Sequence, residues 1–213
     1  MRIIPTTASK NLSTDVTPFI YLASQSPRRS QLLDQMGVAH QLLLPDASED
    51  SEALEVALKS EAPLAYVTRV TALKLDAAVA RMKLRGLLLA PVLCADTTVA
   101  KGRILYGKPQ SEREAARMLT ELSGSTHRVL TSVAIDSGKK RLQAVSESRV
   151  TFAKLSRSQI DRYIATGEPM GKAGSYAVQG RAATFISKIS GSYSGIMGLP
   201  MFETAQLLGK LGF

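Results

Sequence analysis

A turn rich in serine and arginine near the N-terminus has the composition of a phosphate site. The segment Ser24-Gln25-Ser26-Pro27-Arg28-Arg29 follows a short apolar run and precedes residues with helical spacing. A helix that begins here would offer free backbone N–H groups to an anion, and the two arginines would add positive charge and forked donors. Ser-Pro is also ordinary helix-capping chemistry, although cations in a first turn oppose the helix dipole unless an anion compensates them. The segment therefore fits either a structural cap or a phosphate-binding turn.

Two residues further along the chain could act on a bound phosphate. Asp96 interrupts the apolar run Val92-Leu93-Cys94-Ala95-Asp96-Thr97-Thr98-Val99. Because an unpaired buried carboxylate is costly, Asp96 either caps nearby backbone or, as we expect, faces a cation or a water molecule in a cleft. Lys108 lies between Gly107 and Pro109, where it either belongs to a bare turn or is held rigidly over a phosphate.

Two loops could supply further contacts. The acidic segment 46–50 contains Glu49, which is either an oxygen ligand for a divalent ion or one of several solvated acids. The glycines of segment 167–180 would let the backbone approach a ligand closely, and the amide of Gln179 could read the edge of a base. The alternative is a surface loop with turn glycines, but a loop of this length inside a compact domain is more often functional.

The residues that the chain lacks restrict its chemistry. Only two histidines, His40 and His127, and one cysteine, Cys94, are present. We therefore expect neither a zinc site nor a Ser-His-Asp triad, and we assign His127 a structural role. A single cysteine permits no internal disulfide, in agreement with a reducing compartment such as the cytoplasm. Catalysis would have to depend on carboxylates, lysines, arginines and a hard cation.

The excess of 27 Lys and Arg over 18 Asp and Glu gives a net charge of +9. That charge favours a polyanionic partner, namely nucleic acid, an anionic membrane or a polyphosphate. Basic residues are spread along the chain and aromatic residues make up only 5%, so we do not expect a nucleic-acid interface. The cluster Arg81-Met82-Lys83-Leu84-Arg85 is expected on a helix surface. No window approaches the roughly 18 consecutive apolar residues of a membrane span, and the longest apolar run, 87–95, is expected to be a buried strand.

These residues need a scaffold that alternates strands and helices. Helical spacing of apolar residues occurs at 29–36, 62–84, 112–122, 156–165 and 202–211. Strand patterns occur at 19–22, 40–44, 92–99, 128–136, 142–152 and 185–189, and Asp136-Ser137-Gly138-Lys139 predicts a hairpin turn. A hairpin among strand–helix units predicts an α/β fold with a mixed sheet. Residues 1–17 are polar and are expected to form a flexible arm before a single domain, residues 18–213.

Several of these motifs, in this order, resemble the Maf family of nucleoside triphosphate pyrophosphatases. The resemblance runs over residues 19–211, through the segments 24–29, 95–97, 107–109, 122–127, 172–180 and 191–200. Several spaced motifs in order are far more specific than any one of them. The resemblance implies an elongated α/β fold with two lobes around a central cleft, similar to the inosine triphosphate pyrophosphatase architecture, and a homodimer. It also implies hydrolysis of a nucleoside triphosphate to the monophosphate and pyrophosphate.

The resemblance also implies roles for individual residues. It places the proton acceptor at Asp96 and the specificity positions at Arg28, Thr97 and Gln179. The expected phosphate and metal contacts are Ser24, Arg28, Arg29, Glu49, Lys74 and Lys108, with Mg²⁺ or Mn²⁺ held by Glu49 and Asp96. The chain departs from the family pattern at Gly171, where an aspartate is common, and at Ser48, where an acid is expected. With the chemistry of the residues, this predicts attack of water on the α-phosphorus with Asp96 as general base.

The glycine-rich segment indicates a branch of the family. The run Ala173-Gly174-Ser175-Tyr176-Ala177-Val178-Gln179-Gly180 is similar to the form that acts on dTTP and UTP rather than on 7-methyl-GTP. We therefore expect dTTP, UTP and modified pyrimidine triphosphates as substrates. The alternatives are a pyrophosphatase for 7-methyl-GTP or another purine triphosphate and, in another class, a septum-formation regulator or a nucleic-acid-binding protein without turnover.

Overall fold

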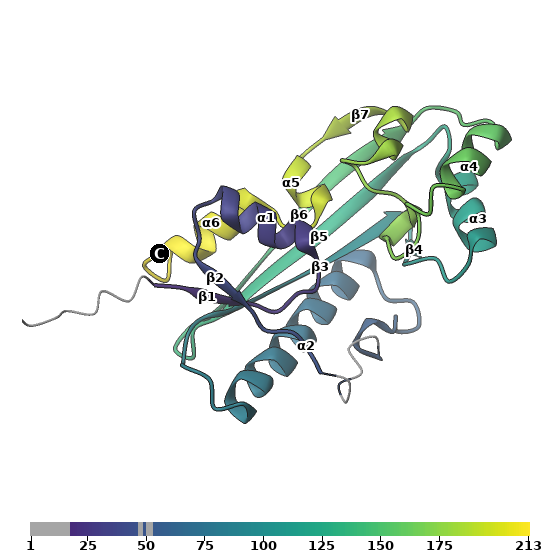
Figure 1. Cartoon of the computed structure of the whole chain (residues 1–213). Coiled ribbons are helices and arrows are strands. Elements are labelled where there is room, and N and C mark those ends of the chain that lie inside the picture. The colour runs from purple at the N-terminus through teal and green to yellow at the C-terminus, as the bar shows by residue number, and fades with distance from the viewer. Residues whose placement is uncertain (1–17, 47–48, 50–52) are drawn as a thin grey trace, which may run out of the picture.

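The computed structural model describes residues 18–46, 49 and 53–213. The predicted flexible arm, residues 1–17, lies outside the described residues, as does Ser48. The helices and strands of Figure 1, with η for 3-10 helices, are β1 (Ile20–Leu22), α1 (Pro27–Gln35), β2 (His40–Leu42), η1 (Ala53–Glu55), α2 (Pro63–Leu84), β3 (Val92–Lys101), β4 (Ile104–Tyr106), α3 (Glu112–Leu122), β5 (Thr126–Asp136), β6 (Arg141–Phe152), α4 (Arg157–Ile164), η2 (Ala173–Ser175), η3 (Arg181–Phe185), β7 (Ile186–Ser190), α5 (Tyr193–Met197) and α6 (Met201–Gly209).

The strands form one mixed sheet, which confirms the predicted α/β class. β1 lies between β2 and β3 and runs parallel to both. β3, β5, β6 and β7 follow in that order, each antiparallel to its neighbour, and β4 pairs with the end of β3. The predicted hairpin joins β5 and β6, and in its turn the Ser137 N–H donates to the Lys140 carbonyl at 3.0 Å. Gly138 has a φ of +78° in this turn, a conformation that glycine adopts without steric cost.

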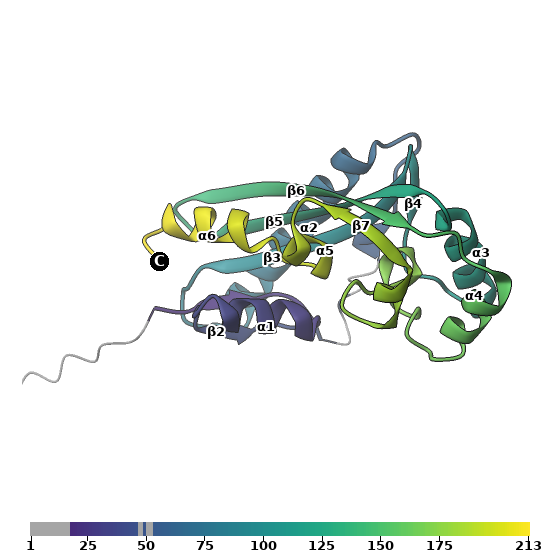
Figure 2. The ribbon, with the colours of Figure 1, turned by 90° about the horizontal axis from the view of Figure 1, so that it is seen from above.

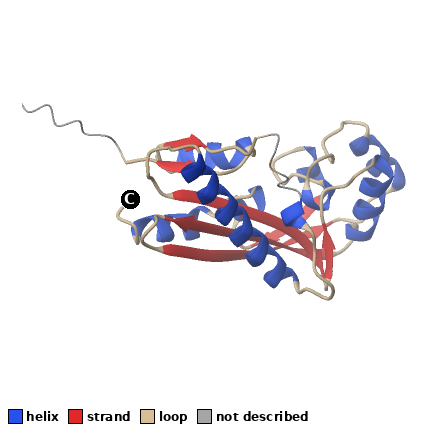
Figure 3. Cartoon of the chain, turned by 90° about the horizontal axis from the view of Figure 1, so that it is seen from below, coloured by secondary structure: helices blue, strands red, loops and turns tan. Residues whose placement is uncertain are grey.

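Helices cover both faces of the sheet at the end that holds β1 and β2. Figure 3 shows α2 crossing one face, and Figures 1 and 2 show α1 and α6 on the other. Side chains that alternate along β3 meet these two layers separately. Leu93 packs in one core with Leu33 of α1, whereas Cys94 packs in another with Leu75 of α2.

A further core lies at the opposite end of the sheet, where α3 and α4 pack together (Figure 2). The helix predicted at 112–122 is present as α3, and its buried residues are Ala115, Met118, Leu119 and Leu122. The helix begins after Ser111, whose side chain accepts from the Glu114 N–H at 3.2 Å. Because Ala95 belongs to the first end and Val99 to the second, residues 96–98 of β3 lie between the two parts of the hydrophobic interior.

The structure departs from the predicted elements in a few places. β4 and α5, of three and five residues, were not predicted. The run 87–95 is extended in the sheet only from Val92, and Leu88 and Leu89 are exposed. Arg81, expected on a helix surface, is only 7% exposed. In the part of the chain that the structure describes, none of the helices combines the length and the apolarity that crossing a bilayer requires.

Candidate active site

A gap along one edge of β3 lies beside the cavity that gathers most of the predicted site residues. β1 pairs with β3 at Val92 and Leu93, and β4 pairs with it from Val99 to Lys101. Between these pairings, residues 94–98 have β5 on one side and, among the described strands, none on the other. A cavity of about 500 Å³ opens beside this gap. Its lining includes Ser24, Arg28, Arg29, Lys74, Asp96 and Lys108.

Inside this cavity, Lys74 bridges two carboxylates. Its ammonium group donates to Asp96 Oδ1 at 2.5 Å and to Glu55 Oε1 at 2.7 Å. Lys108 donates to the other oxygen of Glu55 at 3.0 Å. The three elements α2, β3 and η1 thus bring Lys74, Asp96 and Glu55 together from distant parts of the chain. The arrangement places acids and ammonium groups within reach of one ligand.

The pKa shifts of Lys74 and Glu55 follow from this bridge. Burial alone would lower the pKa of Lys74, but the negative charges of Asp96 and Glu55 outweigh it and raise that pKa. Burial alone would raise the pKa of Glu55, but Lys74 and Lys108 together hold that pKa below its usual value. The ammonium and the Glu55 carboxylate therefore remain charged at neutral pH.

The two arginines of the first turn of α1 are held by the C-terminal end of α5 and the residue that follows it. Arg29 Nε donates to the Gly198 carbonyl at 2.7 Å, and Arg28 Nε donates to the Met197 carbonyl at 3.2 Å. Arg29 Nη1 also donates to Ser24 Oγ at 2.9 Å. Burial lowers the pKa of both guanidinium groups, although an arginine stays protonated at any pH of interest. These contacts fix the direction of two positive charges beside the cavity.

The start of α1 bears on the two interpretations of its sequence. Ser26 is the N-cap residue, but its side chain accepts no hydrogen bond from the helix, and Pro27 occupies the first helical position. Pro27 fits that position because it has no N–H to satisfy. The Ser26 side chain therefore does not cap the helix, and the N-terminus of α1 lies at the cavity, where an anion would be stabilised.

A smaller cavity of about 110 Å³ adjoins the main one. Its apolar wall residues are Val99, Val129, Tyr176, Val178, Ile196 and Met197. Thr97 contributes a hydroxyl, and Arg28, Lys108, Gly171 and Lys172 line both cavities. Tyr176 is held by His127, whose Nε2 lies 2.8 Å from the phenol oxygen. His127 is 1% exposed, in agreement with the structural role predicted for it.

The structure does not bring Gln179 to either cavity. This residue is exposed in the turn that precedes η3, where the Gly180 N–H donates to the Ala177 carbonyl at 3.1 Å. The Glu168 carboxylate accepts from the Arg181 N–H at 3.0 Å and holds the chain just after the turn. A role for Gln179 in reading a base stays a prediction. Gly171 lines both cavities, where it offers backbone but no carboxylate.

The expected metal ligand Glu49 is paired with an arginine in this structure, and its role as a ligand stays a prediction. Its carboxylate is bound by Arg81, with Glu49 Oε2 2.6 Å from Nη2 and Glu49 Oε1 2.7 Å from Nε. Glu49 does not line the cavity, whereas Glu55 does. The sequence analysis missed Glu55 because nothing in its spacing separates it from the other acids of the segment 46–61. Only the fold of this segment selects it.

Asp96 and Glu55 fit a magnesium or manganese ion that is shared with a phosphate. Among the residues that the structure describes, no three His, Cys, Asp or Glu side chains gather into a complete metal site. Mg²⁺ is commonly held by one or two carboxylates together with substrate phosphates and water. Two carboxylates joined by one ammonium group, beside a cluster of cations, match that donor set.

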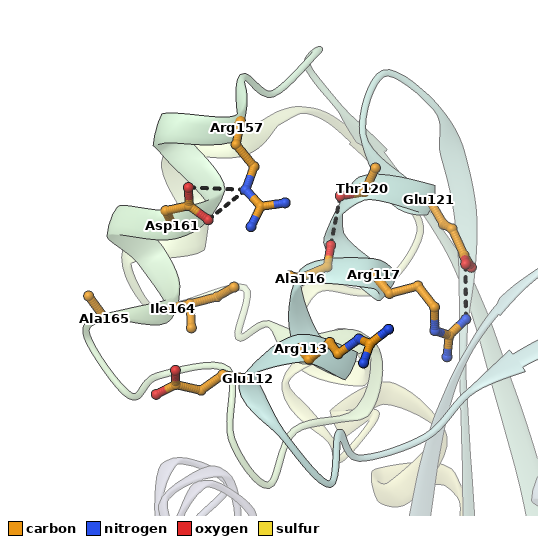
Figure 4. Close-up of a pocket in the computed structure, with 10 residues that line it drawn as sticks. All are labelled: Glu112, Arg113, Ala116, Arg117, Thr120, Glu121, Arg157, Asp161, Ile164 and Ala165. Carbon is orange, nitrogen blue, oxygen red and sulfur yellow. Dashed lines mark hydrogen bonds and ion pairs between the residues drawn. The ribbon is translucent and has the colours of Figure 1, made fainter.

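A second hollow, of about 760 Å³, lies between α3 and α4 (Figure 4). Four of its charged side chains form two pairs within their own helices: Arg117 Nη1 lies 2.9 Å from Glu121 Oε1, and Arg157 Nε lies 2.9 Å from Asp161 Oδ1. It contains none of the predicted site residues. The cavity beside β3 is therefore the candidate active site.

Comparison with known proteins agrees with this geometry. The family model described as Maf-like protein matches residues 19–211. This chain belongs to the Maf family. The resemblance stated from its motifs is thereby confirmed.

Several curated relatives of this Maf protein are named dTTP/UTP pyrophosphatase. One from Albidiferax ferrireducens is 68% identical over 93% of this chain and 99% of its own length. One from Polaromonas sp. is 63% identical over 91% of this chain and 96% of its own length. One from Cupriavidus metallidurans is 56% identical over 92% of this chain and 98% of its own length. Among solved structures, the Ham1 protein of Staphylococcus aureus matches with a TM-score of 0.47 and 12% identity over 90% of this chain and 98% of that chain.

Proposed function

We propose that this Maf protein is a nucleoside triphosphate pyrophosphatase that hydrolyses dTTP and UTP to the monophosphate and pyrophosphate. The observation that carries the proposal is the convergence of Asp96 with six cationic side chains beside the gap in β3. Relatives that are 55–68% identical over about nine tenths of this chain carry the name dTTP/UTP pyrophosphatase. Family and site chemistry thus support the same activity.

The cations provide the binding energy for the triphosphate. Arg28 and Arg29 lie in the first turn of α1, and Lys74 and Lys108 approach from the other walls of the cavity. Fixed positive charges that face the phosphate oxygens stabilise the negative charge that develops on the leaving group. In this proposal Arg28 and Lys108 serve both the phosphates and the base, because they line both cavities.

Asp96 acts as the general base. A water oxygen forms a bond to the α-phosphorus while the bond from that phosphorus to the bridging oxygen breaks and pyrophosphate leaves. The proton of the attacking water passes to the Asp96 carboxylate. Lys74, hydrogen-bonded to Asp96 Oδ1, fixes the orientation of the carboxylate and leaves its second oxygen for the water.

Asp96 and Glu55 would hold the divalent cation, and Glu55 thus takes the place first expected for Glu49. When bound, this cation supplies Lewis-acid stabilisation of the phosphate oxygens. Lys74 contacts both carboxylates, so it keeps them at a spacing that one ligand can share.

The smaller cavity would receive the base. Apolar walls suit the faces of an aromatic ring, and the Thr97 hydroxyl supplies a polar contact at its edge. The volume of about 110 Å³ favours the one-ring base of a pyrimidine over the two-ring base of 7-methyl-GTP.

Pyrophosphate release from dTTP, UTP, CTP, dATP, GTP and 7-methyl-GTP, with Mg²⁺ or Mn²⁺ and with a chelator, tests the proposal. Metal-dependent release that is fastest from dTTP and UTP is the expected result. Preferred release from 7-methyl-GTP would assign the other branch. Release from none of these nucleotides, with steeply salt-sensitive binding to oligonucleotides, would favour a nucleic-acid-binding protein instead.

A further inference from the structure

Three groups on β3, β5 and α5 form a short hydrogen-bond chain behind the smaller cavity. Thr97 Oγ1 lies 2.9 Å from Thr131 Oγ1, and Thr131 Oγ1 donates to the Gly195 carbonyl at 2.7 Å. Thr97 and Thr131 face each other because they are direct partners in the pairing of β3 with β5. Thr97 lines the cavity, whereas Thr131 is completely buried and does not line it.

The chemistry of these groups fixes the direction of both hydrogen bonds. A backbone carbonyl can only accept, and a threonine hydroxyl has a single proton. Thr131 must therefore give its proton to the Gly195 carbonyl. It follows that Thr131 accepts in its other bond and that Thr97 is the donor. The Thr97 hydroxyl is left with only lone pairs to offer to the cavity.

The Gly195 carbonyl is itself held in place. Ser192 is the N-cap residue of α5, and its Oγ accepts from the Gly195 N–H at 3.0 Å. The Ser192 N–H in turn donates to Ser148 Oγ of β6 at 2.9 Å. α5 is thus fastened to the sheet next to β5 and β6, as Figure 2 also shows. The direction of the chain of hydrogen bonds is built into the fold rather than left to solvent.

We propose that Thr131 is a positioning residue that selects uracil and thymine over cytosine by holding the Thr97 hydroxyl as an acceptor. Uracil and thymine carry one hydrogen-bond donor, the N3–H, between two carbonyl oxygens. Cytosine has an unprotonated, accepting N3 at the same place. A hydroxyl that accepts at the edge of the base can take the N3–H of uracil or thymine. With cytosine, a lone pair of the hydroxyl would face the lone pair of N3 and no hydrogen bond would form. This inference rests on the proposed function, because it assumes that the smaller cavity receives the base.

Thr131→Val tests the inference because valine keeps the shape of threonine and removes the hydroxyl. The Gly195 carbonyl keeps the hydrogen bond that it accepts from the Gly198 N–H at 3.0 Å. Thr97, having lost its acceptor, can rotate its proton toward the cavity and donate to the N3 of cytosine. We expect the ratio of kcat/KM for UTP to that for CTP to fall about tenfold, the effect of one neutral hydrogen bond. Thr131→Ser restores the hydroxyl and should restore the ratio.

Thr126→Val is the matched control. Thr126 also lies on β5 and its hydroxyl pairs with that of Thr151 at 2.8 Å, but this pair is exposed and lines neither cavity. We expect the ratio of kcat/KM for UTP to that for CTP in this variant to equal the wild-type ratio. An unchanged ratio in folded Thr131→Val protein would overturn the inference, as would an equal fall in the control.

A second variant and a second measurement keep the test independent of folding and of turnover. If Thr131→Val does not fold, Thr97→Val should weaken the use of UTP more than that of CTP, and an equal loss for both would overturn the inference. Calorimetry measures the affinities for UMP and CMP, and this second measurement requires no hydrolysis. If the wild type releases no pyrophosphate, the proposed function fails, but a UMP preference that Thr131→Val removes would still support the role of Thr131. Equal binding of UMP and CMP by the wild type would reject that role.

Discussion

Replacing Lys74 with methionine is expected to lower the free energy of unfolding by about 3 kcal/mol, the lower end of the cost of removing one partner from a buried ion pair. The side chains of Lys74 and Asp96 are 19% and 10% exposed, and their closest N···O distance is 2.5 Å. Without the ammonium group, Asp96 loses this donor while it stays largely buried. Glu55 keeps Lys108, at 3.0 Å. Most of the cost therefore falls on Asp96.

Thermal and urea unfolding at neutral pH measure this cost. For a chain of this size, about 3 kcal/mol corresponds to a fall in Tm of roughly 6–12 °C. The matched control is Arg157→Met, which removes the pair with Asp161 at 2.9 Å, where the side chains are 78% and 52% exposed. A pair at the surface is worth less than about 0.5 kcal/mol. If Lys74→Met and Arg157→Met cost the same, the bridge between the two carboxylates does not stabilise the fold and our reasoning about the cavity is wrong.

Three other predictions concern the core, the backbone and the phosphate site. Burial and, less strongly, nearby Lys101 lower the pKa of His127 to about 4. The free energy of unfolding should therefore fall by on the order of 3 kcal/mol as the pH drops from about 6.5 to about 4, because only the unfolded chain takes up the proton in this range. Urea titrations at a series of pH values measure this dependence, and His127→Gln should flatten it. Gly174→Ala should lower the free energy of unfolding by about 3 kcal/mol, since Gly174 has a φ of +67° and the new Cβ would lie 2.9 Å from a methyl group of Val99. Gly102 has a similar φ of +62° but open space around it, so Gly102→Ala should lower the same free energy by only about 1 kcal/mol, measured by the same urea unfolding. Arg28→Ala should raise the Kd for a slowly hydrolysed dTTP analogue about tenfold, and a loss of turnover with intact affinity would contradict the phosphate role.

The residues that sequence reasoning placed correctly at the cavity are those whose type conflicts with their surroundings. Asp96 interrupts an apolar run, and Arg28 and Arg29 oppose the dipole of their own helix. Such conflicts are informative because a stable fold tolerates them where they serve a ligand. The bounds of α3 also agree with the prediction, because the helix has a capping serine and a clean apolar stripe.

The residues that sequence reasoning missed or misplaced depend on how distant segments meet. Glu55 and Glu49 lie in the same acidic region, and only the course of the chain pairs one with Lys74 and the other with Arg81. Thr131 is one of several hydroxyls in a strand pattern, and its direction as a donor follows from a carbonyl 64 residues away. Pairings over such separations leave no periodic or compositional signal in a single sequence.

The central claim is that hydrolysis takes place beside the gap in β3 with Asp96 as the base. The most direct measurement compares pyrophosphate release from dTTP and UTP by the wild type, by Asp96→Asn and by Asp76→Asn. Asp76 is a matched control, because it belongs to α2 but pairs with Arg141 at 2.6 Å with a half-exposed side chain outside the cavity. We predict that Asp96→Asn lowers turnover by about 10²-fold or more while nucleotide still binds, and that Asp76→Asn retains wild-type turnover. Near-full activity in Asp96→Asn would contradict the claim.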